Sequence, residues 1–151
     1  LPEADALIRA TGADIRIMGG EAFYVPSRDY IQIPRPDAFP DPINWHRTAF
    51  HELGHWTGHP SRLSRDQSGR FGSPEYGREE LCAEMTSAFV CAALGIEPSV
   101  RHADYLGSWL AILREDNRAI VRAASAASKA ADFLLALGRA EEEAVDLARA
   151  A

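Results

Sequence analysis

The stretch His51-Glu52-Leu53-Gly54-His55 places two imidazoles four residues apart, with a carboxylate directly after the first. Residues four apart lie on one face of a helix, so His51 and His55 are expected to reach one metal ion together. Glu52 lies about 100° around the same helix, beside the coordination position that the two histidines leave open. This is the HExxH arrangement of zinc metallohydrolases.

A catalytic zinc site needs a third protein ligand and leaves a fourth position for water. One subclass adds a histidine three residues after a glycine; Gly58 stands at the glycine position, but Ser61 occupies the place of that histidine. The other common solution takes a glutamate from a second helix, with a carboxylate four residues later that accepts a hydrogen bond from a ligand histidine. Glu80 and Glu84 have this spacing. We therefore predict Glu80 as the third ligand and Glu84 as the supporting acceptor, with exchange of the two roles as the alternative.

Two histidines, one glutamate and an open position favour Zn²⁺ over Mg²⁺ or Ca²⁺, which prefer all-oxygen ligands. Zinc lowers the pKa of water at such a site and polarises a carbonyl group. Glu52 is then predicted to be the general base that takes the water's proton and passes it to the leaving amine. The predicted chemistry is hydrolysis of peptide bonds.

Several other side chains near these motifs are candidates for supporting roles. Tyr76, His59, His102 and Tyr105 can each donate a hydrogen bond to a developing oxyanion, although packing in the core or on the surface is the alternative role for each. His59 would stay on the metal-facing side only if the helix continued, and the glycine and proline beside it argue that it does not. We predict that His59 supports the site or faces the substrate, with a helix-end histidine as the alternative. Glu79 is predicted to be a surface or capping acid.

The polar and apolar pattern predicts an α+β fold. Strands are expected at 14–18, 22–25 and 30–33, joined as a three-stranded antiparallel sheet by a Gly-Gly pair and a Ser-Arg-Asp turn. The last strand, 30–33, is predicted to be the free edge to which an extended substrate adds.

Helices are expected before and after this sheet. Their predicted ranges are 2–11, the active-site helix from Asp41-Pro42 to about Gly58, the glutamate helix 74–94, the segments 98–114 and 117–137, and a last charged helix after Gly138. The sheet is therefore expected to pack on the active-site helix and the glutamate helix, followed by C-terminal helices.

Composition limits the kinds of partner that the chain can have. Its 151 residues suit one domain spanning 1–151, and a first residue other than Met predicts a piece of a longer protein. With 22 acidic and 16 basic residues and no clustered Lys or Arg, we expect no binding of nucleic acid by this domain. Cys82 and Cys91 lie nine residues apart on one predicted helix, too far for a disulfide. No signal peptide or membrane span is visible, so we predict a cytoplasmic protein.

A longer run of motifs surrounds the histidine pair: His51-Glu52-Leu53-Gly54-His55-Trp56-Thr57-Gly58-His59, Arg62-Leu63, Phe71-Gly72, Tyr76 and Glu79-Glu80-Leu81-Cys82-Ala83-Glu84. These segments resemble the C-terminal zincin-like metallopeptidase domain of ArdC-type antirestriction proteins. Further matches lie at 11–15, 22–24, 108–110 and 118–120, so the resemblance covers most of the chain.

The resemblance implies a zincin fold of the gluzincin type and a role in protecting incoming DNA. In that family the metallopeptidase domain follows an N-terminal single-stranded-DNA-binding domain, on proteins carried by plasmids, phages and other mobile elements. Two functions are compatible with the sequence. The first is a zinc metalloendopeptidase that acts on a protein or peptide substrate, and the second is a metal-containing module that sequesters a partner protein without cleaving it. Glu52 favours the enzyme, while the substrate and the oligomeric state stay open.

Overall fold

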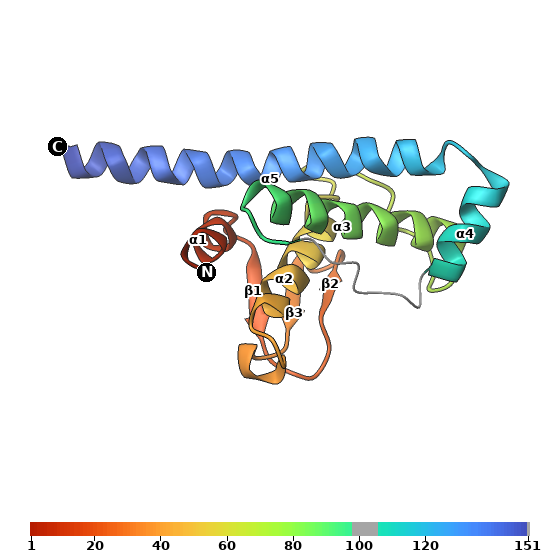
Figure 1. Ribbon diagram of the computed structural model, residues 1–151, viewed down its shortest axis with the longest axis horizontal. Coiled ribbons are helices and arrows are strands. Elements are labelled where there is room, and N and C mark those ends of the chain that lie inside the picture. Colours follow the sequence, from red (N-terminus) through yellow and green to blue (C-terminus); the bar gives the residue numbers. More distant parts are fainter. Residues whose placement is uncertain (98–105, 151) are drawn as a thin grey trace.

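The computed structural model describes residues 1–97 and 106–150, which form an α+β fold (Figure 1). A small sheet lies on one side of helix α2, and helices α3 and α5 are stacked on its other side. The predicted class is confirmed. In chain order the elements are α1 (Pro2–Ala10), β1 (Asp14–Ile17), β2 (Phe23–Val25), β3 (Tyr30–Ile33), a 3₁₀ turn (Pro36–Ala38), α2 (Ile43–Trp56), α3 (Pro74–Ala93), α4 (Leu106–Glu115) and α5 (Ala119–Ala150).

The sheet is mixed, so the prediction of an all-antiparallel sheet was wrong. Its strand order is β1-β3-β2, with β3 parallel to β1 and antiparallel to β2. Burial explains the order, because Ile31 and Ile33 of β3 are fully buried against α2 while most residues of β1 and β2 are partly or fully exposed. The strand richest in buried residues takes the centre. Tyr30–Ile33 is therefore not a free edge, and β1 and β2 form the two edges.

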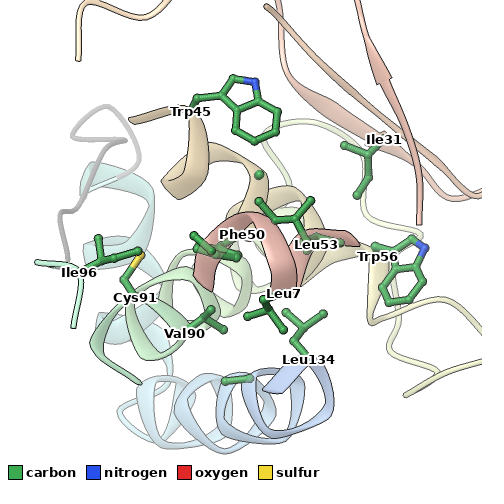
Figure 2. Packing of buried hydrophobic residues seen from close by; sticks show 14 of the residues in the cluster. Leu7, Ile31, Trp45, Phe50, Leu53, Trp56, Val90, Cys91, Ile96 and Leu134 are labelled. Atoms are coloured by element: carbon green, nitrogen blue, oxygen red, sulfur yellow. The ribbon is translucent and has the colours of Figure 1, made fainter. Parts of the chain in front are cut away.

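Helix α2 crosses this sheet and carries the core on its inner side (Figure 2). The carboxylate of Asp41 accepts a hydrogen bond from the Ile43 amide at 3.2 Å, close to the predicted helix start. Phe50 and Leu53 are fully buried, and the Trp45 indole donates to the Pro34 carbonyl at 3.0 Å. Because one side of α2 is fixed to the sheet, the side chains on its opposite side have a defined orientation relative to α3.

Helices α2 and α3 approach each other closely at Gly54. A Cβ atom at position 54 would lie 3.1 Å from the Cα atom of Ala83 and 3.2 Å from the Cβ atom of Thr86. Such distances are tighter than ordinary packing, so the absence of a side chain at Gly54 allows the contact. The contact lies between His51 and His55 on α2 and beside Glu80 and Glu84 on α3.

Helix α5 continues through Gly138, so the predicted break at this position was wrong. A Cβ atom there would lie 2.9 Å from Cδ1 of Leu7, which shows that Gly138 makes room for α1 rather than ending a helix. Beyond it, residues 139–150 are all exposed, and the helix extends past α1 (Figure 1). The predicted helix at 98–114 is described only from Leu106, because 98–105 lie outside the described residues.

Two simpler predictions can be compared directly with the structure. Cys82 and Cys91 are both buried free thiols on α3, as the spacing indicated. Among the described residues, no helix combines the length and the apolar character that crossing a membrane requires.

Candidate metal centre

Three side chains converge where α2 meets α3. Each of His51, His55 and Glu80 offers one nitrogen or oxygen atom, and these three atoms all lie within 4.8 Å of one another. The Nε2 atom of His51 is 3.3 Å from one carboxylate oxygen of Glu80, and the Nε2 atom of His55 is 3.2 Å from the other. The HExxH pair and the predicted third ligand thus face a single point.

The Nδ1 atoms of the two histidines face away from that point, toward two further carboxylates. Glu84 lies 3.0 Å from Nδ1 of His51, which is the position expected of a supporting acceptor. Glu79 lies 3.2 Å from Nδ1 of His55, and its side chain is only 11% exposed. The prediction of Glu79 as a surface or capping acid was therefore wrong. Each imidazole can donate from Nδ1 and keep Nε2 free for a metal.

The loop after α2 closes over Glu79, a feature that sequence reasoning missed. The Arg65 guanidinium donates to both Glu79 oxygens, at 3.0 and 2.8 Å, and also to the Gly54 carbonyl at 2.6 Å. The Gln67 amide donates to Glu79 at 2.9 Å and to the His55 carbonyl at 2.7 Å. These bonds fix the carboxylate that orients His55 and satisfy carbonyl groups at the end of α2.

The charges in the centre reinforce one another. Burial lowers the pKa of His55, but hydrogen bonds with Glu79 and Glu80 outweigh it and raise the pKa to about 10. Burial raises the pKa of Glu79, but hydrogen bonds from His55 and Arg65 outweigh it and lower the pKa to about 2. The pKa of Glu80 is likewise lowered, against its burial, by its hydrogen bonds to His51 and His55. Both carboxylates are thus anionic at neutral pH. Glu79 is available as a hydrogen-bond acceptor for His55, and Glu80 is available as a metal ligand.

The centre opens into a cavity of about 390 Å³. Glu52 lines this cavity beside the converging atoms, and it is buried, with 6% of its surface exposed. Tyr76 lines the same cavity, with its ring centroid 5.3 Å from that of Phe71. The remaining lining residues are Ala22, Phe23, Tyr24, Pro26, His51, His55, Gln67, Gly69, Glu75, Glu79 and Glu80.

The other candidate residues lie elsewhere. His59 does not line the cavity, and its Nδ1 atom lies 2.7 Å from the Ser61 hydroxyl in the loop after α2. The helix ends at Trp56, before His59, and a role of His59 near the metal or the substrate stays a prediction. His102 and Tyr105 lie outside the described residues.

The donor set suits a zinc ion. Two imidazole nitrogens and one carboxylate, all nearly buried and each imidazole oriented by a second carboxylate, are the ligands of catalytic zinc sites. The cavity leaves space for water or substrate at the remaining coordination position. The residues present therefore fit the metal that the motif predicts.

Loss of the Arg65 contacts is expected to weaken metal binding without removing a ligand. Arg65→Gln leaves Glu79 less well fixed, so we expect about a tenfold lower zinc affinity, measured by competition with a fluorescent chelator. Arg78→Gln is the matched control, because the Arg78 side chain is 43% exposed and forms a long ion pair, 3.8 Å, with Glu75. Equal zinc affinity in Arg65→Gln and the native protein would show that the loop does not support the centre.

Comparisons with known proteins agree with this geometry. The chain is similar to the crystal structures of the antirestriction protein ArdC from plasmid R388. The Mn(II)-bound ArdC structure is 42% identical to this chain with a TM-score of 0.83, and the match covers 91% of this chain and 52% of ArdC. The metal-free ArdC structure is 43% identical with a TM-score of 0.80, and the match covers 92% of this chain and 51% of ArdC. It is also 50% identical over 138 residues to the DNA primase TraC of Escherichia coli, and 44% identical over 142 residues to protein y4eC of Sinorhizobium fredii.

These relatives are longer proteins. The match covers 88% of this chain but 13% of TraC, and 89% of this chain but 46% of y4eC. The model of the zincin-like metallopeptidase family matches residues 2–126, and the chain therefore belongs to that family.

Proposed function

We propose that this chain is a zinc-dependent peptidase that hydrolyses peptide bonds. The observation that carries the proposal is the convergence of His51, His55 and Glu80 at a cavity that Glu52 also lines. A purely structural zinc site has four protein ligands, whereas the described part of this chain offers three ligands and an opening. A buried carboxylate beside the opening is the group that a hydrolase needs.

Each side chain has a defined part in the proposed reaction. When bound, zinc supplies polarisation of the scissile carbonyl and a lower pKa for the attacking water. Glu52 accepts the proton of that water and delivers it to the leaving amine. Glu79 and Glu84 keep the two imidazoles in orientation through their Nδ1 atoms. Tyr76, on the cavity wall, is the described candidate for a hydrogen bond to the developing oxyanion.

Strand β2 is the proposed docking edge for an extended substrate. It is an edge of the sheet, since β3 pairs with it on one side only, and Phe23 and Tyr24 line the cavity of the metal centre. A peptide laid against β2 would gain main-chain hydrogen bonds and pass beside the ligands. The docking edge proposed here replaces the one predicted at Tyr30–Ile33.

Digestion of a bacterial proteome tests the peptidase proposal without knowledge of the substrate. The zinc-loaded protein is incubated with native lysate proteins, and newly formed peptide termini are identified by mass spectrometry. We expect a reproducible set of cleavages that disappears after chelation and returns with added zinc. Cleavages that persist equally in chelator would belong to a contaminating protease and would contradict the proposal.

The biological setting that we propose is protection of incoming DNA by a longer antirestriction-type protein. Support comes from the similarity to ArdC, of which this chain spans about half. In this arrangement the present domain binds a protein substrate, and contact with single-stranded DNA belongs to another part of the protein. The net charge of −6 agrees with this assignment, because a negatively charged domain is not expected to bind DNA phosphates.

A further inference from the structure

A second arginine of the loop after α2, Arg62, is fixed to the end of that helix. Its Nε atom donates to the Trp56 carbonyl at 2.6 Å, and its guanidinium lies 3.8 Å from the centroid of the Trp56 ring. The side chain is 11% exposed. A cation stacked on a tryptophan and bonded to a helix-end carbonyl has little freedom, so Arg62 is attached firmly to α2.

The same guanidinium reaches the sheet. It donates to both carboxylate oxygens of Asp29, one of them at 3.1 Å, and to the Tyr24 hydroxyl at 3.4 Å. Tyr24 belongs to β2 and donates in turn to Asp29 at 2.8 Å. Hydrogen bonds from Arg62 hold the pKa of Asp29 below its ordinary value, against the effect of burial. Arg62 thus connects α2 to β2 and to the turn that follows it.

This connection matters because β2 is a weakly held strand. It has three residues, all partly exposed, and among the described strands it pairs with β3 alone. Phe23 and Tyr24 of this strand are part of the wall of the cavity at the metal centre. A short edge strand is readily displaced unless side chains fix it to a neighbouring element.

We propose that Arg62 is a positioning residue that fixes β2 relative to the metal-binding helix α2, and thereby sets the width of the cleft that receives an extended polypeptide. The part that concerns substrate rests on the peptidase function proposed above. Arg62 and Arg65 lie in the same loop but serve different groups. Arg65 contacts Glu79, which orients the metal ligand His55. Arg62 instead contacts Asp29 and Tyr24, and Tyr24 is part of the cavity wall.

Two variants test the connection from its two ends. Arg62→Gln removes the cation, and Asp29→Asn removes the carboxylate. Asp29 has a φ of 51°, a conformation that asparagine adopts readily, so Asp29→Asn leaves the turn geometry unstrained. Arg28→Gln is the matched control, because Arg28 lies in the same turn with an exposed side chain.

Amide hydrogen exchange and metal binding give the first readout, and they require no catalysis. In both variants we expect the amides of β2 to exchange about tenfold faster or more, with α2 protection and zinc affinity unchanged. Arg28→Gln should behave as the native protein. Unchanged β2 exchange in both variants, or a loss of zinc affinity like that expected for Arg65→Gln, would overturn the proposal.

Steady-state cleavage of fluorescein-labelled casein gives the second readout. A displaced β2 impairs substrate binding rather than proton transfer, so KM should rise about three- to tenfold with kcat within about twofold of the native value. A lower kcat at native KM would contradict the positioning role. If neither casein nor any lysate protein is cleaved in a zinc-dependent way while the exchange results are as expected, the positioning of β2 stands and the peptidase function is the part that fails.

Discussion

Glu52→Gln is expected to retain zinc and fold while lowering peptide hydrolysis by about two to four orders of magnitude. The amide is nearly isosteric with the carboxylate, so it fills the same place in the cavity, but it cannot accept the proton of the attacking water. Zinc content by metal analysis, thermal unfolding and cleavage of the substrates found by proteome digestion are measured on the same preparation.

Three outcomes of the Glu52→Gln experiment have different meanings. Loss of zinc together with activity would make Glu52 a ligand and contradict its assignment as the base. Native cleavage rates with zinc retained would assign the base to another group. If the full-length protein keeps its antirestriction activity with zinc bound and hydrolysis abolished, the binding-module function is favoured, and proteolysis is unnecessary for the protein's biology.

Glu80→Gln is expected to lower zinc affinity by more than about two orders of magnitude, because it removes the carboxylate whose two oxygens face the Nε2 atoms of His51 and His55. Glu84 contacts Nδ1 of His51 rather than the metal-facing Nε2 atom, so Glu84→Gln should lower zinc affinity by about ten- to a hundredfold. Affinities are measured by chelator competition, with Glu3→Gln on the exposed side of α1 as the control. The opposite ranking, with zinc kept in Glu80→Gln and lost in Glu84→Gln, would exchange the two roles.

The residues of the centre could be predicted where their spacing within one helix determines their positions. His51 and His55 share a face of α2, and Glu80 and Glu84 share a face of α3, so two short patterns were enough to bring three donors and one supporting acceptor together. The role of Glu79 could not be predicted in this way. Its partners Arg65 and Gln67 lie in an irregular loop, whose path depends on tertiary contacts rather than on periodicity.

The errors in the fold have a similar cause. Strand positions were predictable from alternating residues, but the pairing of β1 with β3 joins segments that are separated by β2 in the sequence. A Gly-Gly pair is a local hairpin signal, and it cannot reveal that a later, more apolar strand occupies the centre. Gly138 was similarly misjudged, because its neighbour Leu7 lies at the other end of the chain.

The close approach at Gly54 has a consequence for ion selectivity. The two histidines and Glu80 come from different helices, so the separation of α2 from α3 sets how far apart the three donor atoms lie. Zinc bonds to nitrogen and oxygen are about 2.0–2.2 Å long, whereas calcium bonds to oxygen are about 2.3–2.6 Å. A side chain at position 54 would widen the gap and favour larger ions. We therefore expect Gly54, by keeping α2 and α3 close, to favour zinc over larger ions at these three donors.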